Sequence, residues 1–404
     1  MAMKTSENFF ARLAGCVAGM GLAAVLAWPA WGQLQVQLPK IHSSKGPELV
    51  FVGTYTNKTA SKGIYAFRFD GRNGKISALT VAAESADPSF VVVSADGKFL
   101  YAVNEVGDFG GASSGAISAY SIERPSGKLT LLNQVASGGA DPCFVSVDKT
   151  GKFLFVANYS GGSVGVFALG ADGKIGERTT FEQHTGHGAL KDRQDAPHAH
   201  WVATSADNRY ALEVDLGLDQ VIVDKFDETN GKITPNDPPF ASLEAGAGPR
   251  HLAFSPNQKF AYVTNEIGST VTVFSYDADK GTLEPKQTIG TLPRDYNGQN
   301  DTAEIVMHPS GKFLYVSNRG RDSIAIFGVS AKTGILTSIG DFLTRGKTPR
   351  NFTIDPSGHY LLVANEATND IEVFRIDLST GELGFTGERV EVPAPVDIVF
   401  AGSN

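Results

Sequence analysis

A short phrase recurs seven times along this chain of 404 residues, and its spacing restricts the architecture that the chain can adopt. Five copies are complete: YAVNE at 101–105, FVANY at 155–159, YVTNE at 262–266, YVSNR at 315–319 and LVANE at 362–366. Two copies are degenerate, FVGT at 51–54 and LEVDL at 212–216. The copies lie roughly 50 residues apart, a period that is typical of propeller blades rather than of helical solenoids.

Each repeat contains four short strand-like segments. In the sixth repeat we expect strands at 303–309, 313–318, 324–329 and 335–339, separated by turns rich in Gly, Ser and Asp. The 45 glycines and 25 phenylalanines of the chain suit many short strands joined by tight turns. The pattern therefore predicts an all-β protein built from four-stranded blades.

The two ends of the repeat region complement each other. Residues 395–400 match the segments that open other repeats, at 249–254 and 349–354, but no further strand follows them. Residues 49–52 begin like the second strand of a blade. We therefore expect a seven-bladed β-propeller over 47–404, in which the C-terminal strand joins the N-terminal blade and leaves no open sheet edge.

The first 32 residues differ from the rest. Lys4 and Arg12 precede a charge-free apolar run at 13–28, and small residues follow it at 30–32. This pattern predicts a secretory signal peptide over 1–32, followed by a linker at 33–46 and a periplasmic or secreted mature protein. A retained N-terminal anchor is the alternative, and a cytoplasmic protein follows if the segment is not a signal. Cys143 would then be the only cysteine of the mature chain, so we expect no intramolecular disulfide.

The formal net charge is -8, which argues against binding to nucleic acid or to anionic membranes, and we expect no membrane contact in the mature form. A local basic site for a small anion remains compatible with this charge.

Polar residues interrupt the repeat at one end of the predicted blades. Neighbouring antiparallel strands bring the start of the first strand and the end of the second strand to the same rim. Aligning the repeats places His198 where Arg250 and Arg350 stand, and His200 where the other blades have apolar residues. The residues expected on this rim are His198, His200, Asp215, Arg250, Glu266, Glu304, Arg319, Arg350 and Glu366.

These residue types suit hydrolysis. A histidine can take a proton from water near neutral pH, and arginines can hold an anionic group or a developing oxyanion. A carboxylate can orient either. The alternative is a network of salt bridges that only holds neighbouring blades together.

The long segment 184–197 leads into the fourth blade and should lie over the same rim, which adds Arg193 to the candidates. It places four histidines close together in sequence, at 184, 187, 198 and 200. No cysteine or paired carboxylate completes a recognisable metal-binding spacing, so we expect no metal and no cofactor.

Several segments, in their order and spacing, resemble the lactonase family of seven-bladed propellers, which includes bacterial 6-phosphogluconolactonases and is related to fungal carboxy-muconate lactonising enzymes. The segments are VGTYT at 52–56, RQDAPHAH at 193–200, DLG at 215–217, GPRH at 248–251, NE at 265–266, AE at 303–304, SNRG at 317–320 and PR at 349–350. In the muconate enzymes a histidine, two arginines and a glutamate are implicated in catalysis. The resemblance places these on His198 or His200, Arg250, Glu266 and Arg319.

We therefore expect a lactone hydrolase acting on a small sugar-acid lactone of the 6-phosphogluconolactone type, without a cofactor. The expected catalytic residues are His198, His200, Arg250, Glu266 and Arg319. The expected substrate-binding residues are Asp215, Glu304, Arg350, Glu366 and Arg193. The alternatives are an exported propeller that binds a glycan or a protein without catalysis, and a cycloisomerase of the muconate type.

Overall fold

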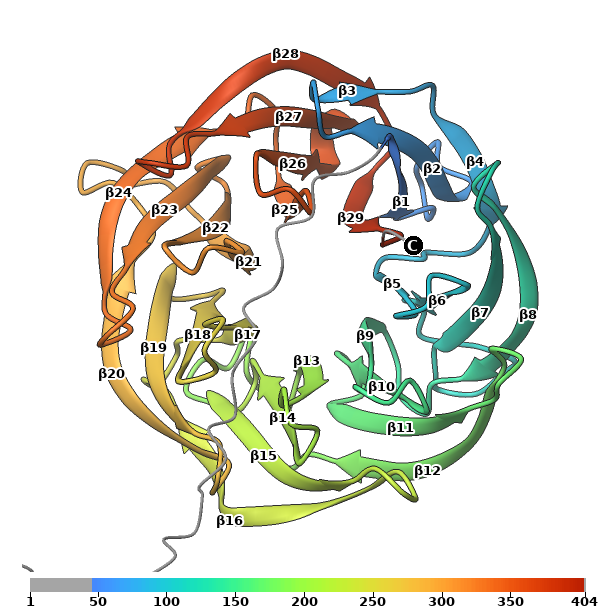
Figure 1. Cartoon of the computed structure of the whole chain (residues 1–404). Coiled ribbons are helices and arrows are strands. Elements are labelled where there is room, and N and C mark those ends of the chain that lie inside the picture. Colours follow the sequence, from blue (N-terminus) through green and yellow to red (C-terminus); the bar gives the residue numbers. More distant parts are fainter. Residues whose placement is uncertain (1–45, 403–404) are drawn as a thin grey trace, which may run out of the picture. The chain divides into compact units, whose positions relative to one another are not determined.

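A computed structural model describes residues 46–402, which form seven antiparallel sheets arranged as a ring (Figure 1). The predicted signal peptide and almost all of the predicted linker lie outside the described residues. Blade one contains β29 (Pro395–Phe400), β1 (Glu48–Thr54), β2 (Gly63–Asp70), β3 (Lys75–Ile76) and β4 (Thr80–Glu84). Blade two contains β5 (Val91–Val93), β6 (Phe99–Asn104), β7 (Ala116–Glu123) and β8 (Lys128–Ala136).

The other five blades follow in chain order, each with its first strand nearest the centre of the ring. Blade three contains β9 (Pro142–Val147), β10 (Phe153–Asn158), β11 (Ser163–Leu169) and β12 (Ile175–Gln183). Blade four contains β13 (Ala199–Thr204), β14 (Tyr210–Asp215), β15 (Gln220–Asp227) and β16 (Lys232–Ser242). Blade five contains β17 (Pro249–Phe254), β18 (Phe260–Asn265), β19 (Thr270–Asp277) and β20 (Thr282–Gly290).

Blade six contains β21 (Asp301–Met307), β22 (Phe313–Arg319), β23 (Ser323–Val329) and β24 (Leu336–Leu343). Blade seven contains β25 (Pro349–Ile354), β26 (Tyr360–Asn365), the short 3-10 helix η1 (Glu366–Thr368), β27 (Asp370–Ile376) and β28 (Leu383–Glu391). The predicted fold class is confirmed. Within residues 46–402 there is no helix long and apolar enough to cross a membrane.

The ring is closed by strands from the two ends of the described chain. The inner strand of blade one is β29, which pairs antiparallel with β1 through partners such as Phe51 and Val399. The prediction that the C-terminal strand completes the N-terminal blade is therefore confirmed. Because the backbone groups of β1 are paired on both sides, the ring has no open edge between its first and last blades.

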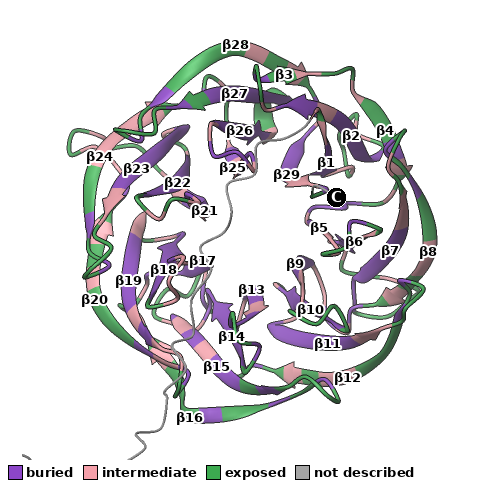
Figure 2. Cartoon of the chain, viewed as in Figure 1, coloured by how far each residue is buried: buried purple, intermediate pink, exposed green. Residues whose placement is uncertain are grey.

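Burial decreases outward along each blade. Figure 2 shows that the second and third strands are largely buried, whereas outer strands such as β16, β20 and β28 are largely exposed. Apolar side chains of the middle strands fill the spaces between neighbouring blades, and clusters of buried residues consequently span two or more blades. The hydrophobic core is thus a series of interfaces around the ring, each stabilising two blades at once.

One glycine in the outer hairpin of every blade lies against the preceding blade. All seven have a positive φ, and a Cβ atom on any of them would come within 3 Å of a side chain at the start of a second strand. The glycines are Gly74, Gly127, Gly173, Gly231, Gly281, Gly334 and Gly381. Six of them face an aromatic ring, and Gly127 faces Leu49. The glycine therefore allows the tip of each outer hairpin to pack flat against its neighbour.

We expect Gly334→Ala to destabilise the ring more than a change in backbone preference alone would. Gly334 has a φ of 73°, and a Cβ there would lie 2.4 Å from the ring of Phe260. Gly387 is the matched control, because its φ of 82° is similar but nothing lies within 4 Å of its Cβ position. Urea unfolding should show a loss of about 1–2 kcal/mol for Gly387→Ala and about 1–3 kcal/mol more for Gly334→Ala. Equal losses would contradict the packing role.

Candidate active site

A β-bulge at the start of the inner strands presents side chains to the rim. In blade five, Pro249 pairs with Asn265 and His251 pairs with Thr264, so Arg250 has no partner in the ladder. The same register shift occurs at Arg350 in blade seven, at His200 in blade four and at Cys143 in blade three. A bulge leaves one extra residue and redirects its side chain, which is a recurrent feature beside active sites.

The register corrects the alignment of the repeats that the sequence predicted. His200, not His198, occupies the bulge position of Arg250, because Ala199 rather than Pro197 is the first paired residue of blade four. In blade six the shift between Thr302 and Ile305 places Glu304 level with His251. Counting from the strand-opening proline failed because blade four starts two residues after its proline.

Three arginines converge on the carboxylate of Glu266, which follows β18. Arg193 Nη2 lies 2.5 Å from Oε1, while Arg250 Nε and Arg319 Nη2 lie 3.1 and 2.7 Å from Oε2. Burial alone would raise the pKa of Glu266, but the charges of Arg319 and Arg250 outweigh it and lower that pKa to about 2. Glu266 is therefore an anionic anchor for the arginines, and such a weak base accepts few protons at neutral pH.

Arg250 also contacts a second set of residues at the base of this cluster. Its Nη1 lies 3.3 Å from His251 Nε2, and His251 Nδ1 lies 3.1 Å from the Glu304 carboxylate. Since the guanidinium can only donate, Nε2 accepts and Nδ1–H donates to Glu304. Burial lowers the pKa of His251 to about 4, despite the charge of Glu304, which agrees with a neutral ring.

His251, Glu304 and the side chains at the same position of the other inner strands form the floor of the site. Asn351 Nδ2 donates to Glu304 at 2.8 Å, and Phe144 contacts the rings of His251 and Trp201 with centroids 5.2 and 5.7 Å apart. These residues occupy one position on successive inner strands around the centre of the ring. Their side chains contact one another across the channel, so the arginines one residue earlier lie above a packed layer.

Arg350 lies on the other side of the site, next to blade one. Its guanidinium carbon is 5.3 Å from the centroid of the Tyr55 ring, and the Tyr55 hydroxyl donates to Glu105 at 3.0 Å. Among the described residues, the Arg350 guanidinium has no hydrogen bond to a protein group, although its side chain is only half-buried. It is therefore a cation that can take an anionic ligand without first breaking an ion pair.

The two predicted histidines have different surroundings. His198 stacks on Tyr159 with ring centroids 4.5 Å apart, and its Nδ1 lies 3.1 Å from the Tyr159 carbonyl oxygen. A carbonyl only accepts, so Nδ1 carries the hydrogen and Nε2 is left as a base. The His198 side chain is 15% exposed. His200 is buried beside Cys143, and burial, followed by the charge of Arg250, lowers its pKa well below the usual value.

The segment before β13 crosses the rim, as the sequence predicts. This segment places Arg193 in contact with Glu266. Gln194 holds the segment in place, because its side-chain amide donates to the Leu216 carbonyl and to Asp219, each at 2.8 Å. Asp215 accepts the backbone N–H groups of His198 and Leu218 at 2.8 and 3.1 Å and pairs with His184 at 2.6 Å. Both carboxylate oxygens of Asp215 are thus bonded to residues of this segment and of the turn that follows β14.

The structure brings most predicted site residues together. One group surrounds Glu266: Arg193, Arg250 and Arg319. Glu304 lies in the floor of the site, and His198 and His200 flank Tyr159. Arg350 lies on the opposite side, close enough to Glu366 for its pKa to be raised by that charge. Asp215 is the exception, because it is buried beneath the loop. The alternative of ion pairs between blades also holds, since Glu266 joins blades five and six, and it does not exclude a site.

The site also contains residues that were not predicted: Tyr55, Glu105, Phe144, Tyr159, Trp201, His251 and Asn351. Tyr159 stands inside the repeated phrase, and His251 follows Arg250 directly, so both carried a signal in the sequence. Tyr55 and Glu105 meet Arg350 only because the ring brings blades seven, one and two together.

Comparisons with known proteins identify the relatives of this chain. Residues 49–400 match the family model described as lactonase, 7-bladed beta-propeller. A 6-phosphogluconolactonase of Bacillus subtilis is 35% identical over 305 residues, covering 76% of this chain and 84% of the relative. A 6-phosphogluconolactonase of Formosa agariphila is 37% identical over 315 residues, covering 76% of this chain and 86% of the relative. The solved periplasmic gluconolactonase of Pseudomonas aeruginosa superposes with a TM-score of 0.82 at 34% identity, covering 88% and 99% of the two chains.

We expect Glu266→Gln to destabilise the protein in a pH-dependent way. Folding lowers the pKa of Glu266 from about 4.5 to about 2, so its ion pairs stabilise the fold fully above pH 4.5 and lose this contribution as the pH falls through about 2. Urea unfolding at pH 7 should show a loss of about 3–5 kcal/mol for the variant. The difference from the wild type should shrink below pH 4.5.

The matched control is Glu244→Gln, which changes an exposed glutamate. Its free energy of unfolding should stay within about 0.5 kcal/mol of the wild type at pH 7 and at pH 3. A loss for Glu266→Gln that is the same at pH 7 and pH 3 would contradict the ion-pair account.

Proposed function

Because the chain belongs to the lactonase family of seven-bladed β-propellers, we propose that it hydrolyses an anionic sugar-acid lactone of the 6-phosphogluconolactone type. The relatives named above, 6-phosphogluconolactonases and a gluconolactonase, support this class of substrate. The observation that carries the proposal is the gathering of three arginines around the carboxylate of Glu266, with His198 stacked on Tyr159 and Arg350 on the opposite side of the site.

The arginines of this arrangement provide hydrogen-bond donors for an anionic substrate. Three guanidinium groups share the carboxylate of Glu266, and Asp301 lies 3.6 Å from Arg193 Nη1. His251 and His200 are neutral because burial lowers the pKa of each. Arg193 is 39% exposed, so it can reach a ligand while Glu266 holds it. A phosphate or carboxylate group would therefore find charge-assisted donors at Arg193 and Arg350.

His198 is the better of the two histidines for activating water. Its Nδ1–H is fixed by a backbone carbonyl, which orients the basic Nε2, and the side chain is partly exposed. His200 is buried against Cys143 and its lowered pKa makes it a weaker base. We assign His198 as the general base, and His200 as a residue that packs against Tyr159 beneath it.

The reaction then follows from these roles. His198 Nε2 takes a proton from water as the water oxygen bonds to the lactone carbonyl carbon. Guanidinium N–H groups stabilise the negative charge that develops on the carbonyl oxygen. The ring C–O bond breaks, the ring oxygen receives the proton, and the product is an open-chain hydroxy acid. Glu266, with its low pKa, is a positioning residue for the arginines rather than a base.

We also propose that the protein is exported. The predicted signal peptide at 1–32 motivates this, and the periplasmic location named for the Pseudomonas aeruginosa relative supports it. An intact N-terminus on the protein recovered from cells, by mass spectrometry, would contradict export with cleavage.

His198→Gln should lower kcat for lactone hydrolysis by about 10²- to 10⁴-fold, because the base is lost. The assay follows acid release from 6-phosphogluconolactone and glucono-δ-lactone, with spontaneous hydrolysis subtracted. His187→Gln is the control, since His187 is an exposed histidine of the same loop. Full activity in His198→Gln with loss in His200→Gln would reverse the assignment, and no activity of the wild type on either lactone would overturn the proposal.

Arg350→Ala should act mainly on binding of the anionic group. We expect KM for 6-phosphogluconolactone to rise about 10- to 100-fold, corresponding to the loss of one charge-assisted contact, with a much smaller change for the uncharged lactone. Arg178→Ala on the outer strand β12 is the matched control. An equal effect on both lactones would show that Arg350 does not recognise the anion.

A further inference from the structure

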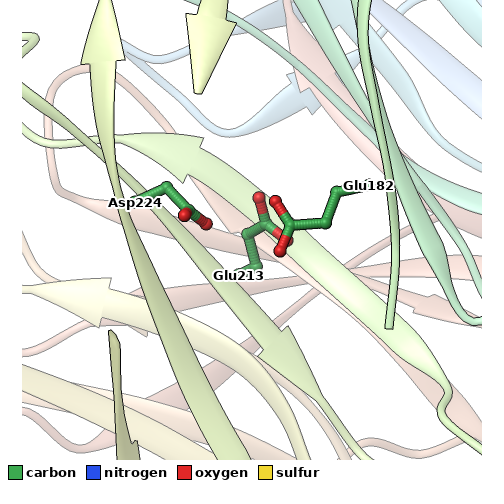
Figure 3. A group of neighbouring side chains, drawn as sticks. All are labelled: Glu182, Glu213 and Asp224. Carbon is green, nitrogen blue, oxygen red and sulfur yellow. The ribbon is translucent and has the colours of Figure 1, made fainter. Parts of the chain in front are cut away.

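A second cluster of ionisable side chains lies away from the rim, at the junction of blades three and four. Figure 3 shows Glu182 of β12, Glu213 of β14 and Asp224 of β15 with their carboxylates directed toward one another. One carboxylate oxygen from each lies within 4.8 Å of the others. Glu213 and Asp224 are buried, and Glu182 is half-buried at the edge of the cluster.

The same positions are apolar in all six other blades. The strand registers place Asp224 level with Phe67, Tyr120, Phe167, Phe274, Phe327 and Phe374. They place Glu213 level with Val52, Ala102, Val156, Val263, Val316 and Val363. They place Glu182 level with Ala83, Val135, Ala241, Ile289, Phe342 and Val390. Three carboxylates thus replace one apolar interface at a single junction of the ring.

The carboxylates are not satisfied by the described part of the chain. Asp224 is 1% exposed, and neither of its oxygens has a hydrogen-bond partner within residues 46–402. Glu213 uses Oε2 to bind His184 at 2.8 Å, but its buried Oε1 has no partner there. Buried charges of this kind are costly unless a cation compensates them.

Among residues 46–402, the cation that contacts this cluster is His184, and it is already paired. His184 lies between Glu213 and Asp215, and although burial opposes it, hydrogen bonds to these two acids raise the His184 pKa to about 10. One imidazolium therefore faces four carboxylates. Burial, followed by the charge of Glu213, raises the pKa values of Asp224 and Glu182, which reflects the same crowding.

We propose that Glu182, Glu213 and Asp224 bind a divalent cation, and that Ca²⁺ fits them best. All three donors are carboxylate oxygens, which hard cations prefer, and the imidazole of His184 is already occupied. Ca²⁺ accepts carboxylate oxygens in a flexible geometry, whereas Mg²⁺ demands near-ideal octahedral geometry, and these three carboxylates come from three strands of two blades. Half-buried Glu182 provides the route of entry.

The bound cation would be structural. It would tie the outer strand of blade three to the middle strands of blade four, where the other junctions use apolar contacts. Through Glu213, His184 and Asp215 it would also support the backbone N–H of His198. This role is independent of the lactone chemistry, so binding can be tested whether or not the protein hydrolyses a lactone.

The test compares thermal unfolding of the full chain at pH 7.5 in about 5 mM CaCl₂ and in EGTA, a concentration that saturates even weak protein sites. We expect Ca²⁺ to raise Tm by about 5 °C, a shift that requires the Ca²⁺ concentration to lie far above Kd. Isothermal titration should give one binding site. Asp224→Asn and Glu182→Gln should remove both responses. Glu372→Gln, a buried acid on the third strand of blade seven, should keep them.

Glu182→Val/Asp224→Phe carries residue types of the other blades and provides a second variant if Asp224→Asn does not fold. We expect it to unfold at the same temperature with and without Ca²⁺. No response of the wild type to Ca²⁺ would overturn the proposal and leave protonated acids as the explanation. A response retained by both Glu182→Gln and the double variant would also overturn it, because the cation would then bind elsewhere.

Discussion

Closure of the ring is the constraint on which the rest of the structure depends. The pairing of β1 with β29 fixes the seventh interface, and the outer glycines allow each blade to pack against the one before it. The candidate site is formed by residues from several blades. Arg250 comes from blade five, Arg319 from blade six, Arg350 from blade seven and Tyr55 from blade one. The distances between them are therefore set by the radius of the ring.

The fold could be predicted from the sequence because one interface is repeated seven times, so each copy of the phrase supports the others. The site could be predicted only as a set of residues. His198, Arg250 and Arg319 were found because they break the repeat, but the contacts of the site depend on bulges that a repeat count does not reveal. Because the inner strand of blade four starts two residues after its proline, His200 rather than His198 occupies the position of Arg250. The contact of Arg193 with Glu266 depends further on the course of a long loop.

The acidic cluster of Glu182, Glu213 and Asp224 could not be predicted from the repeated phrase either. Glu213 stands within the aligned phrase, where it replaces a small apolar residue. Glu182 lies in the fourth strand of blade three and Asp224 in the third strand of blade four, outside the repeated phrase. Only the strand pairing shows that the three positions are equivalent to an apolar interface elsewhere. Blade four thus differs from the others on two sides, at the rim through His198 and His200 and at its junction with blade three. His184 and Asp215 join these two sides.

The pairing of β29 with β1 also sets the order of events during biosynthesis. A ribosome makes β29 about 340 residues after β1, so blade one lacks its inner strand while blades two to seven are being made. The emerging chain can form blades two to seven, but it cannot close them into a ring. The ring therefore reaches its native state only after β29 has been made, and until then the edge of β1 stays open to chaperones.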